Sequence, residues 1–361
     1  MDKKLKVGII GCGGIANGKH LPALSKVSEV EMVAFCDIIR ERAENAKKEY
    51  GTTDAKVYTD YKELISDKSI DVVHICTPNK SHAPITIDSL ESGKHVMCEK
   101  PMAKTAAEAK MMLEAAKRTG KKLTIGYQNR QMKEMRHLKK MCENGDLGDI
   151  YYGKALALRR RAVPTWGVFM NKEEQGGGPL IDIGTHALDL TLWTMNNYDV
   201  ASVSGNVHYQ LGQQANCANA WGQWDPETFD VEDSAFGFIK MKNGATIILE
   251  SSWAINLRDC REATCTLAGS KAGVDFAEGM KINGEEYAKL YVKDIELDAS
   301  GVAFYEGVND NDPSGMEARQ WIDSILNDTK PTVLPEQALV VSQILEAIYE
   351  SHRTGKTVYF D

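Results

Sequence analysis

An aspartate–histidine pair and a lysine are the side chains of this sequence best suited to moving a proton. Asp182 and His186 are four residues apart, so a helix that begins near Asp182 places both side chains on one face. An imidazole with a pKa of about 6.5 suits a general base, and a carboxylate can orient it and stabilise its protonated form. Lys100 follows an apolar run and precedes Pro101. Its ammonium group could bond a substrate hydroxyl and stabilise the negative charge that develops on the oxygen.

Each of these residues also has a structural interpretation. Lys100 could be an ordinary exposed lysine, and Asp189 is more simply a packing or capping residue. Asp182 and His186 could be two metal ligands, but no third ligand with suitable context is apparent, so we predict no metal site. Eight cysteines without a Cys-x-x-Cys pair indicate buried free thiols, although Cys12, beside a helix start, could be reactive.

A glycine-rich segment near the start of the chain predicts a dinucleotide site. Gly11–Ala16 reads Gly-Cys-Gly-Gly-Ile-Ala, has the G-x-G-x-x-A pattern and follows the apolar run Lys6–Ile10. Its first glycine permits a tight turn, its second lets the backbone approach a pyrophosphate, and its alanine lets the helix pack on the strand. The helix that starts there offers free N–H groups to phosphate. The cofactor contacts expected in this segment are Gly11, Gly13, Gly14 and Ile15.

An acidic residue after the second apolar run indicates which cofactor binds. Asp37 follows Val30–Cys36 and lies 26 residues after Gly11, where a carboxylate binds the adenosine ribose hydroxyls. Its charge would repel a 2′-phosphate, so we predict NAD in preference to NADP. Arg40 and Arg42 fit a solvated helix face, but both could soften this preference, and we count Arg42 among the candidate cofactor contacts.

Further polar residues follow the later apolar runs. Ligands of parallel sheets bind beyond the carboxyl ends of the strands. The residues after two neighbouring strands should therefore lie beside the nicotinamide. The cofactor contacts expected from these two positions are Thr77, Asn79, His82, Glu99 and Lys100, and Gln128, which follows the last strand of the first domain, is a further one.

Two kinds of sheet must position these residues. The first 125 residues alternate short apolar runs with helical patterns such as Ala43–Glu49 and Lys104–Arg118, which predicts a parallel, doubly wound sheet. Continuous apolar runs are typical of strands covered on both faces. The predicted strands are Leu5–Ile10, Val30–Cys36, Val57–Tyr58, Val72–Cys76, His95–Cys98 and Lys122–Ile125.

The pattern changes after about residue 148. Longer strand-like segments follow, and Asn243–Gly244 and Asn283–Gly284 each lie between extended runs, which predicts type I′ hairpins and an antiparallel sheet. The second half is therefore α+β, and we divide the chain into domains 1–125 and 126–361. Its predicted elements are the strand regions Ile150–Arg161, Val200–Leu211 and Ser234–Trp253 and the helices Gly315–Leu326 and Pro335–His352.

Composition excludes several classes of protein. The chain has 361 residues, 43% of them hydrophobic, which fits two globular domains. Its net charge of −8 argues against nucleic acid and anionic lipid as partners. No apolar run approaches the ~18 residues that span a bilayer, and the N-terminus lacks the features of a signal peptide. We therefore expect a soluble, cytoplasmic protein.

In this order, the motifs resemble the glucose–fructose oxidoreductase, inositol dehydrogenase and rhizopine-catabolism protein family, written Gfo/Idh/MocA. The resemblance spans about half of the chain by position, and the Glu-Lys-Pro and Asp-x-Gly-x-His segments are its specific part. It is carried by Gly11–Ala16, Asp37, Thr77-Pro-Asn79 with His82, Glu99-Lys-Pro101, Gly126-Tyr127, and Gly178 with Asp182-Ile-Gly-Thr-His186.

The resemblance implies a fold and an activity. It implies an N-terminal Rossmann domain and an open, mostly antiparallel C-terminal sheet, often used to form homodimers or homotetramers. It implies an NAD-dependent dehydrogenase acting on a sugar, glycoside or cyclitol, with Lys100 as catalytic lysine and Asp182 with His186 as acid/base pair. An indole face suits a sugar ring, so Trp166 is a candidate substrate contact, with core packing as the alternative. The candidate substrate contacts are Lys100, Gln128, Arg130, Trp166, Asp182 and His186.

Two other functions stay open at this stage. Some relatives use NAD transiently to cleave glycosidic bonds, and others are non-catalytic dinucleotide-binding regulators. The retention of Lys100, Asp182 and His186 argues against a regulator. The segment Gly212–Asp230 carries Trp221 and Trp224 with little secondary-structure signal, and a loop of that length is uncommon unless functional. We expect it to form a lid or a subunit contact.

Overall fold

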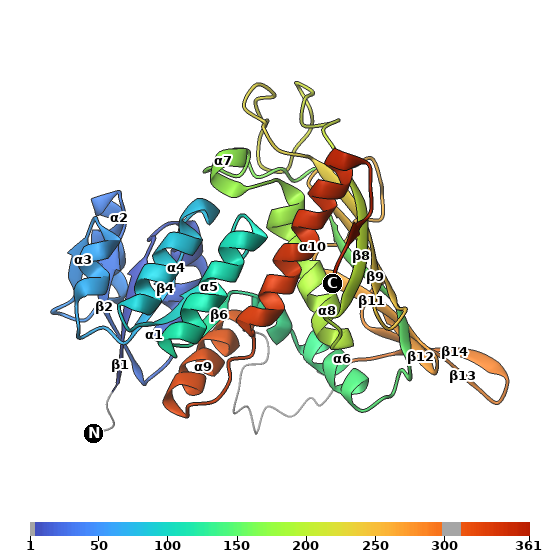
Figure 1. The fold of residues 1–361 in the computed structure, drawn as a ribbon, viewed down its shortest axis with the longest axis horizontal. Helices are drawn as coiled ribbons and strands as arrows, with labels where there is room; N and C mark the ends of the chain where they lie inside the picture. Colours follow the sequence, from blue (N-terminus) through green and yellow to red (C-terminus); the bar gives the residue numbers. More distant parts are fainter. Residues whose placement is uncertain (1–3, 298–311) are drawn as a thin grey trace. The chain divides into compact units, whose positions relative to one another are not determined.

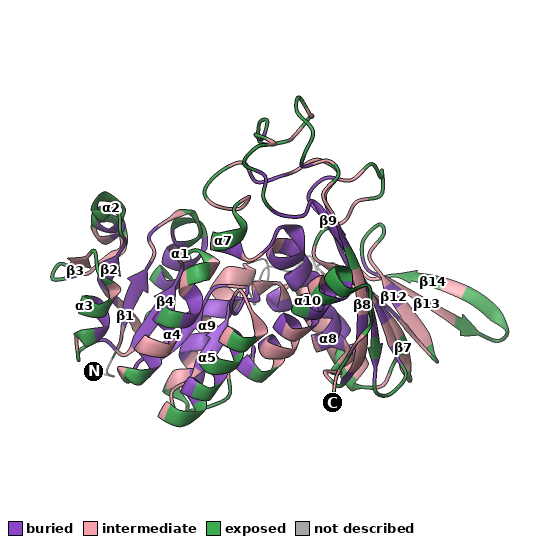
Figure 2. Ribbon diagram, turned by 45° about the horizontal axis from the view of Figure 1, so that its top comes forward, coloured by how far each residue is buried: buried purple, intermediate pink, exposed green. Residues whose placement is uncertain are grey.

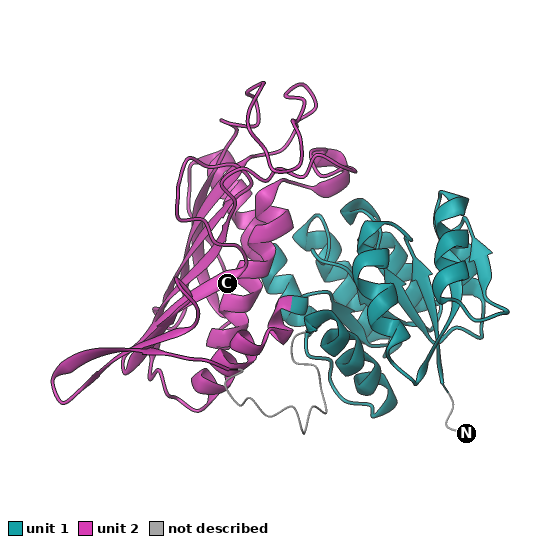
Figure 3. Cartoon of the chain, turned by 180° about the vertical axis from the view of Figure 1, so that it is seen from behind, with its two compact units in different colours: residues 1–128, 312–342 teal, residues 129–311, 343–361 magenta. Residues whose placement is uncertain are grey.

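The computed structural model describes residues 4–297 and 312–361. Met1–Lys3, part of the N-terminal segment in which we expected no signal peptide, lie outside the described residues. The chain divides into two compact units, Met1–Gln128 with Asp312–Ser342, and Asn129–Asn311 with Gln343–Asp361 (Figure 3). Within the described residues, no helix is long and apolar enough to cross a membrane.

The first unit takes in a C-terminal segment that the sequence-based division placed in the second domain. Helix α9 (Pro313–Leu326) belongs to this unit because its apolar side chains Ala318, Trp321 and Ile322 join the same buried cluster as Leu21 of α1 (Leu21–Ser25). A single domain boundary drawn from the sequence cannot show that a C-terminal segment packs in the N-terminal unit.

The sheet of the first unit is parallel, with the strand order β3-β2-β1-β4-β5-β6. Figure 1 labels β1, β2, β4 and β6 of this sheet. This order is that of two mononucleotide-binding halves joined between β1 and β4, so the predicted doubly wound sheet is confirmed. Its strands are β1 (Leu5–Ile10), β2 (Val30–Cys36), β3 (Lys56–Tyr58), β4 (Val72–Ile75), β5 (His95–Cys98) and β6 (Leu123–Ile125). Its other helices are α2 (Arg40–Tyr50), α3 (Tyr61–Ser66), α4 (His82–Glu91) and α5 (Ala106–Thr119).

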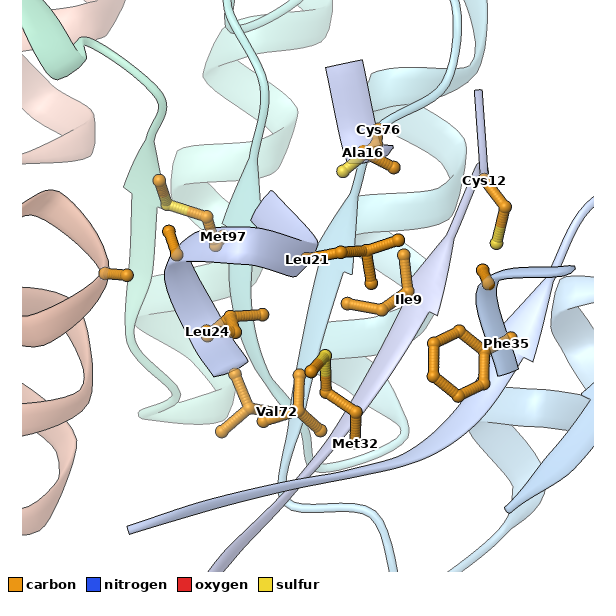
Figure 4. Close-up of a cluster of buried hydrophobic side chains, with 14 of the residues drawn as sticks. Ile9, Cys12, Ala16, Leu21, Leu24, Met32, Phe35, Val72, Cys76 and Met97 are labelled. Carbon is orange, nitrogen blue, oxygen red and sulfur yellow. The ribbon is translucent and has the colours of Figure 1, made fainter. Parts of the chain in front are cut away.

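One hydrophobic cluster fixes the first helix of this unit on the sheet. Ile9, Phe35 and Met97 come from three strands, and Leu21 and Leu24 come from α1 (Figure 4). All five are at most 2% exposed. Burying side chains of this size contributes about 1.5–3 kcal/mol each, so the helix that follows the glycine-rich turn is held firmly in place.

The second unit contains a nine-stranded sheet, ordered β14-β13-β12-β11-β7-β10-β9-β8-β15. Its strands pair antiparallel except β7 and β10, which are parallel, so the expected mostly antiparallel sheet is confirmed. Its strands are β7 (Ile150–Leu158), β8 (Val200–His208), β9 (Ser234–Met241), β10 (Thr246–Ser252), β11 (Thr264–Gly269), β12 (Ala272–Asp275), β13 (Lys281–Glu286), β14 (Lys289–Asp294) and β15 (Val358–Tyr359). Its helices are α6 (Lys133–Glu143), α7 (Lys172–Gln175) and α8 (Thr185–Met195), and α10 (Pro335–Thr354) begins in the first unit and ends in the second.

The two predicted hairpins differ from the structure in their turns. Asn243–Gly244 does connect β9 to β10, but only Gly244 has a positive φ (+92°). The turn is therefore type I followed by a left-handed glycine, not type I′. Asn283 and Gly284 lie inside β13, and the positive φ angles belong to Tyr287 and Ala288. A Cβ on Gly284 would lie 2.4 Å from the Tyr291 hydroxyl, so a larger residue there would have to displace the end of that side chain.

Candidate functional site

The glycine-rich turn is tightly constrained at its first glycine and open at its next two. Gly11 has a φ of +87°, and a Cβ there would lie 2.6 Å from the Cys76 carbonyl oxygen, so only glycine fits. Around Gly13 and Gly14, by contrast, a Cβ would meet no described atom within 4 Å. The backbone is thus open on that side, at the start of the helix that includes Ile15. Open backbone at a helix N-terminus fits a bound dinucleotide phosphate.

Asp37 lies directly beside this turn. Its Oδ2 accepts the Cys12 N–H at 2.8 Å and its Oδ1 accepts the Ile39 N–H at 2.8 Å, so the carboxylate is fixed at the end of β2. The next residue, Ile38, is 89% exposed. Arg42 is exposed on α2, which is compatible both with a solvated helix face and with a cofactor contact.

The Cys12 thiol is buried and protonated in this setting. Burial, followed by the charge of Asp37, raises the pKa of Cys12 to about 12. A thiol with so high a pKa is a poor nucleophile, so this geometry favours the structural interpretation of the residue. All eight cysteines are free thiols.

His82 braces the ends of two neighbouring strands. It is 1% exposed, with Nδ1 at 2.8 Å from the Pro101 carbonyl oxygen and Nε2 at 2.9 Å from that of Thr77. Burial lowers the pKa of His82, against the opposing effect of the two carbonyls. The ring therefore connects the segments that follow β4 and β5. Asn79, another predicted cofactor contact, begins the short 3₁₀ turn that precedes His82.

Glu99 anchors a buried network that sequence analysis did not anticipate. Lys19 Nζ lies 2.6 Å from Glu99 Oε1, 2.9 Å from Glu317 Oε2 and 3.0 Å from Gln128 Oε1. His20 Nε2 lies 2.7 Å from the same Glu99 oxygen. Glu99 was predicted to contact the cofactor, but its carboxylate is 5% exposed and surrounded by these partners. Gln128, predicted at the same site, is also part of the network.

Burial and the neighbouring charges shift the pKa values of the ionisable groups in this network. Burial alone would raise the pKa of Glu99, but Lys19 and His20 hold it well below its usual range. Burial alone would lower the pKa of Lys19, but Glu317 and Glu99 raise it. Burial raises the pKa of Glu317. The lysine and Glu99 are therefore a fixed charge pair, and Glu317 is a second carboxylate bound to the same ammonium group.

Lys100 is attached to this network through its backbone. Its N–H donates to Glu99 Oε2 at 3.1 Å. Gly126 makes room for that carboxylate, because a Cβ there would lie 3.0 Å from Glu99 Oε1. The Glu-Lys-Pro and Gly-Tyr motifs are thus parts of one arrangement, in which Glu99 fixes the backbone of the candidate catalytic lysine. Thr77, at the end of the neighbouring strand, places its Oγ1 out of contact with solvent.

The candidate acid/base pair lies across a change of helix type in the second unit. Asp182 is in a π-helical turn, Leu180–Gly184, and His186 is in the first turn of α8. Single π turns occur often at functional sites. Asp182 Oδ2 accepts the Trp253 indole N–H at 3.0 Å, and His186 is 8% exposed.

A second buried carboxylate, Glu232, holds the start of this helical segment. Its Oε2 accepts the Gly178 N–H at 2.9 Å, and its Oε1 accepts the Leu180 N–H at 3.2 Å and the Tyr349 hydroxyl at 2.8 Å. A Cβ on Gly177 would lie 2.0 Å from the Tyr349 oxygen. The glycines before Asp182 therefore leave room for Glu232 and Tyr349 to approach the backbone.

Arg130 does not lie on the surface of its unit. It is 0% exposed, and its guanidinium binds both oxygens of Asp189, at 2.8 and 2.6 Å. The same group lies 5.5 Å from the centre of the Trp193 ring. Of the predicted substrate contacts, this one has the surroundings of a core residue, which agrees with the packing role expected for Asp189.

The structure thus gathers the predicted residues into two sets, one in each unit. Among the described residues, no group of three or more His, Cys, Asp or Glu side chains could hold a metal ion. The first unit contains the open glycine-rich turn, the fixed carboxylate of Asp37 and the fixed backbone of Lys100, and the second contains Asp182 and His186. Such groups can bind a dinucleotide and move a hydroxyl proton.

Comparison with known proteins identifies the family. Residues 5–127 match the family described as "Oxidoreductase family, NAD-binding Rossmann fold", and residues 135–275 match "GFO/IDH/MocA C-terminal domain". The chain therefore belongs to the Gfo/Idh/MocA family of NAD-binding oxidoreductases, as its motifs indicated.

Individual relatives agree with this assignment. The chain is 37% identical over 358 residues to D-glucoside 3-dehydrogenase of Escherichia coli, covering 98% of this chain and 97% of that protein. It is 36% identical over 194 residues to inositol 2-dehydrogenase of Salmonella typhimurium, covering 53% and 55% of the two chains. Levoglucosan dehydrogenase in complex with NADH shares its fold, with a TM-score of 0.83 and 21% identity over 99% of this chain and 100% of that one.

Proposed function

We propose that this protein oxidises a ring hydroxyl of a glycoside to a ketone with NAD⁺, or catalyses the reverse reduction. The observation that carries the proposal is the 37% identity to D-glucoside 3-dehydrogenase over nearly the whole of both chains. The glycine-rich turn and Asp37 would hold NAD, which accepts a hydride from the substrate carbon when bound.

The chain's own residues would manage the hydroxyl proton. The His186 imidazole takes that proton as the carbon–oxygen double bond forms, and Asp182 stabilises the resulting imidazolium. The Lys100 ammonium donates a hydrogen bond to the same oxygen and stabilises its negative charge. Glu99 contributes by fixing the backbone N–H of Lys100.

The test is NAD⁺ reduction, followed by absorbance, against methyl and aryl glucosides, free hexoses and inositols. We expect turnover of a glycoside that falls by at least about a hundredfold in Lys100→Ala and His186→Ala. Lys110→Ala on α5 and His352→Ala on α10 are matched controls, because both side chains are exposed. Release of the aglycone without net NADH would instead identify glycoside cleavage by transient oxidation, and unchanged turnover in both active-site variants would disprove the assigned roles.

We also infer a homo-oligomer in the cytoplasm, built through the sheet of the second unit. Phe238, 50% exposed on β9, lies opposite Ile248 of β10 in the sheet, so this face presents apolar side chains that a second copy could cover. Light scattering of the purified protein should give a dimer or tetramer, and Phe238→Lys should shift it toward the monomer. A monomeric wild type would refute the inference.

A further inference from the structure

Two tryptophans of the second unit are exposed side by side. Trp166 is 51% exposed and Trp221 is 44% exposed, and their ring centres lie 4.9 Å apart with an interplanar angle of 76°. They come from the segments that follow β7 and β8. Figure 2 shows that the long loops between β8 and β9 are largely exposed. Large apolar groups that cluster on a surface mark interaction sites.

The segment between β8 and β9 also contains aromatic side chains that are buried. Trp224 and Phe229 are 6% and 8% exposed, and their rings lie 6.1 Å apart. Trp224 also donates its indole N–H to the Gly212 carbonyl oxygen at 2.9 Å, and Phe229 packs on Trp253. The loop segment therefore has a small core of its own, and the exposed pair lies outside it.

The exposed pair is nevertheless held in a fixed position. Thr165 Oγ1 donates to the Trp221 carbonyl oxygen at 2.5 Å. The Asn219 side chain accepts the Val163 N–H at 2.8 Å and donates to its carbonyl at 2.9 Å. The Arg159 guanidinium lies 5.2 Å from the centre of the Trp221 ring. Rings fixed in this way bind a ligand at a low cost in conformational entropy.

A continuous series of aromatic contacts joins this pair to the candidate catalytic carboxylate. Trp166 lies 5.9 Å from Phe169, and Phe169 lies 6.4 Å from Trp253, between ring centres. Trp253 donates its indole N–H to Asp182. The exposed pair and Asp182 are therefore connected, within the same unit, through the rings of Phe169 and Trp253.

We propose that Trp166 and Trp221 form a platform that binds the aglycone ring of a glycoside while the neighbouring sugar ring is oxidised. The inference rests on the proposed function and specifies its substrate class. An aryl group or a second pyranose presents a flat apolar face, and an indole offers the matching surface. Free monosaccharides and methyl glycosides have no group that reaches the platform, so they gain nothing from it.

The test compares phenyl glucoside with methyl glucoside of the same anomeric configuration. In Trp166→Ala and Trp221→Ala, kcat/KM for phenyl glucoside should fall about three- to tenfold, and kcat/KM for methyl glucoside should change less than twofold. Trp166→Phe and Trp221→Phe should restore most of the loss. Tyr151→Ala is the matched control, because this aromatic residue of β7 is 60% exposed and lies outside the platform.

A binding measurement separates this inference from the proposed function. Phenyl glucoside binding to the NAD-loaded protein is measured by calorimetry. In both alanine variants its affinity should fall by the same factor as kcat/KM for phenyl glucoside. If the wild type oxidised no glycoside but the alanine variants still bound phenyl glucoside more weakly, the platform would be supported and the proposed function rejected. An equal loss for both glycosides, no loss for either, or a change of oligomeric mass with an intact phenyl-to-methyl ratio would overturn the platform.

Discussion

Lys19 Nζ lies 2.6 Å from a carboxylate oxygen of Glu99 and directly joins the glycine-rich turn to the Glu-Lys-Pro motif. Lys19 is in the π-helical turn Ala16–His20 that follows the fingerprint, and Glu99 immediately precedes Lys100. Glu317 of α9 binds the same ammonium group. A segment from the far end of the chain is therefore part of the arrangement that fixes the cofactor turn and the candidate lysine.

Removal of the lysine charge should destabilise the first unit strongly. Lys19→Met leaves Glu99 and Glu317 buried without their shared cation, which costs about 3–5 kcal/mol when a buried pair is broken. Glu317→Gln should cost less, because the amide oxygen can still accept from Lys19 while Glu99 keeps the ammonium group paired. Urea unfolding followed by circular dichroism compares the two variants. Equal losses of unfolding free energy would contradict the central role of the Lys19 charge.

Arg130 should affect stability and leave substrate affinity unchanged. Arg130→Met leaves Asp189 buried without its partner and should cost about 3–5 kcal/mol of unfolding free energy. Arg130→Met with Asp189→Leu should recover part of that loss, because no charge is then left unpaired. If soluble Arg130→Met instead raised the KM for a glycoside severalfold at unchanged thermal stability, Arg130 would be a substrate contact after all.

The sequence predicted the parts of this molecule that depend on local pattern. Each strand of the first sheet was anticipated to within one residue at either end, because apolar runs between helical patterns are a local signal. The hairpin after β13 was misplaced, since Gly284 lies inside β13, paired with Tyr291 of β14, and not in the turn. The turn at Tyr287 and Ala288 uses residues that seldom adopt positive φ.

The supporting residues of the site could not be predicted in the same way. Lys19 and Glu99 are 80 positions apart, and Glu232 is 54 positions from the Gly178 N–H that it accepts. Nothing near either residue in the sequence indicates its partner. The motif residues themselves were visible because their chemistry is local, whereas the contacts that fix them depend on how distant segments fold together.

The stability of the first unit should depend on the ionisation of His95. Burial, aided by Lys121 and Lys122, lowers the pKa of His95 to about 4 from an ordinary value of 6.5. The neutral ring is favoured in the folded state, where Nδ1 accepts the Lys122 N–H at 3.1 Å. Its contribution is therefore fully present above pH 6.5 and is lost as the pH falls toward 4.

For this half-buried ring we expect a contribution of about 1 kcal/mol to the unfolding free energy, after allowance for solvent screening. Thermal unfolding at several pH values should show a shallower decline in His95→Gln than in the wild type. Parallel curves for the two proteins would contradict the assignment, and His352→Gln, exposed in the second unit, serves as the matched control.

Asp37 should set the preference for NAD. Asp37→Asn removes the charge that repels a 2′-phosphate and keeps an oxygen for the Cys12 N–H, so the NADP-to-NAD ratio of kcat/KM should rise about tenfold. Arg42, exposed nearby, would then be able to pair with the added phosphate. Glu41→Gln removes an exposed charge from the same helix without touching the turn and should leave the ratio unchanged. A wild type that already uses NADP as well as NAD would contradict the premise.

Glu232 should influence catalysis through the helix that carries Asp182 and His186. It accepts the N–H groups of Gly178 and Leu180 at the start of that helical segment, so Glu232→Gln puts an amide donor where an acceptor is required. We expect a loss of about 1–3 kcal/mol in unfolding free energy and a fall in kcat of about ten- to a hundredfold, since small displacements of catalytic groups are costly. Tyr349→Phe removes a single hydrogen bond to the same carboxylate and should have a smaller effect on both quantities. Destabilisation of Glu232→Gln with an unchanged kcat would show that the carboxylate supports the fold without positioning the acid/base pair.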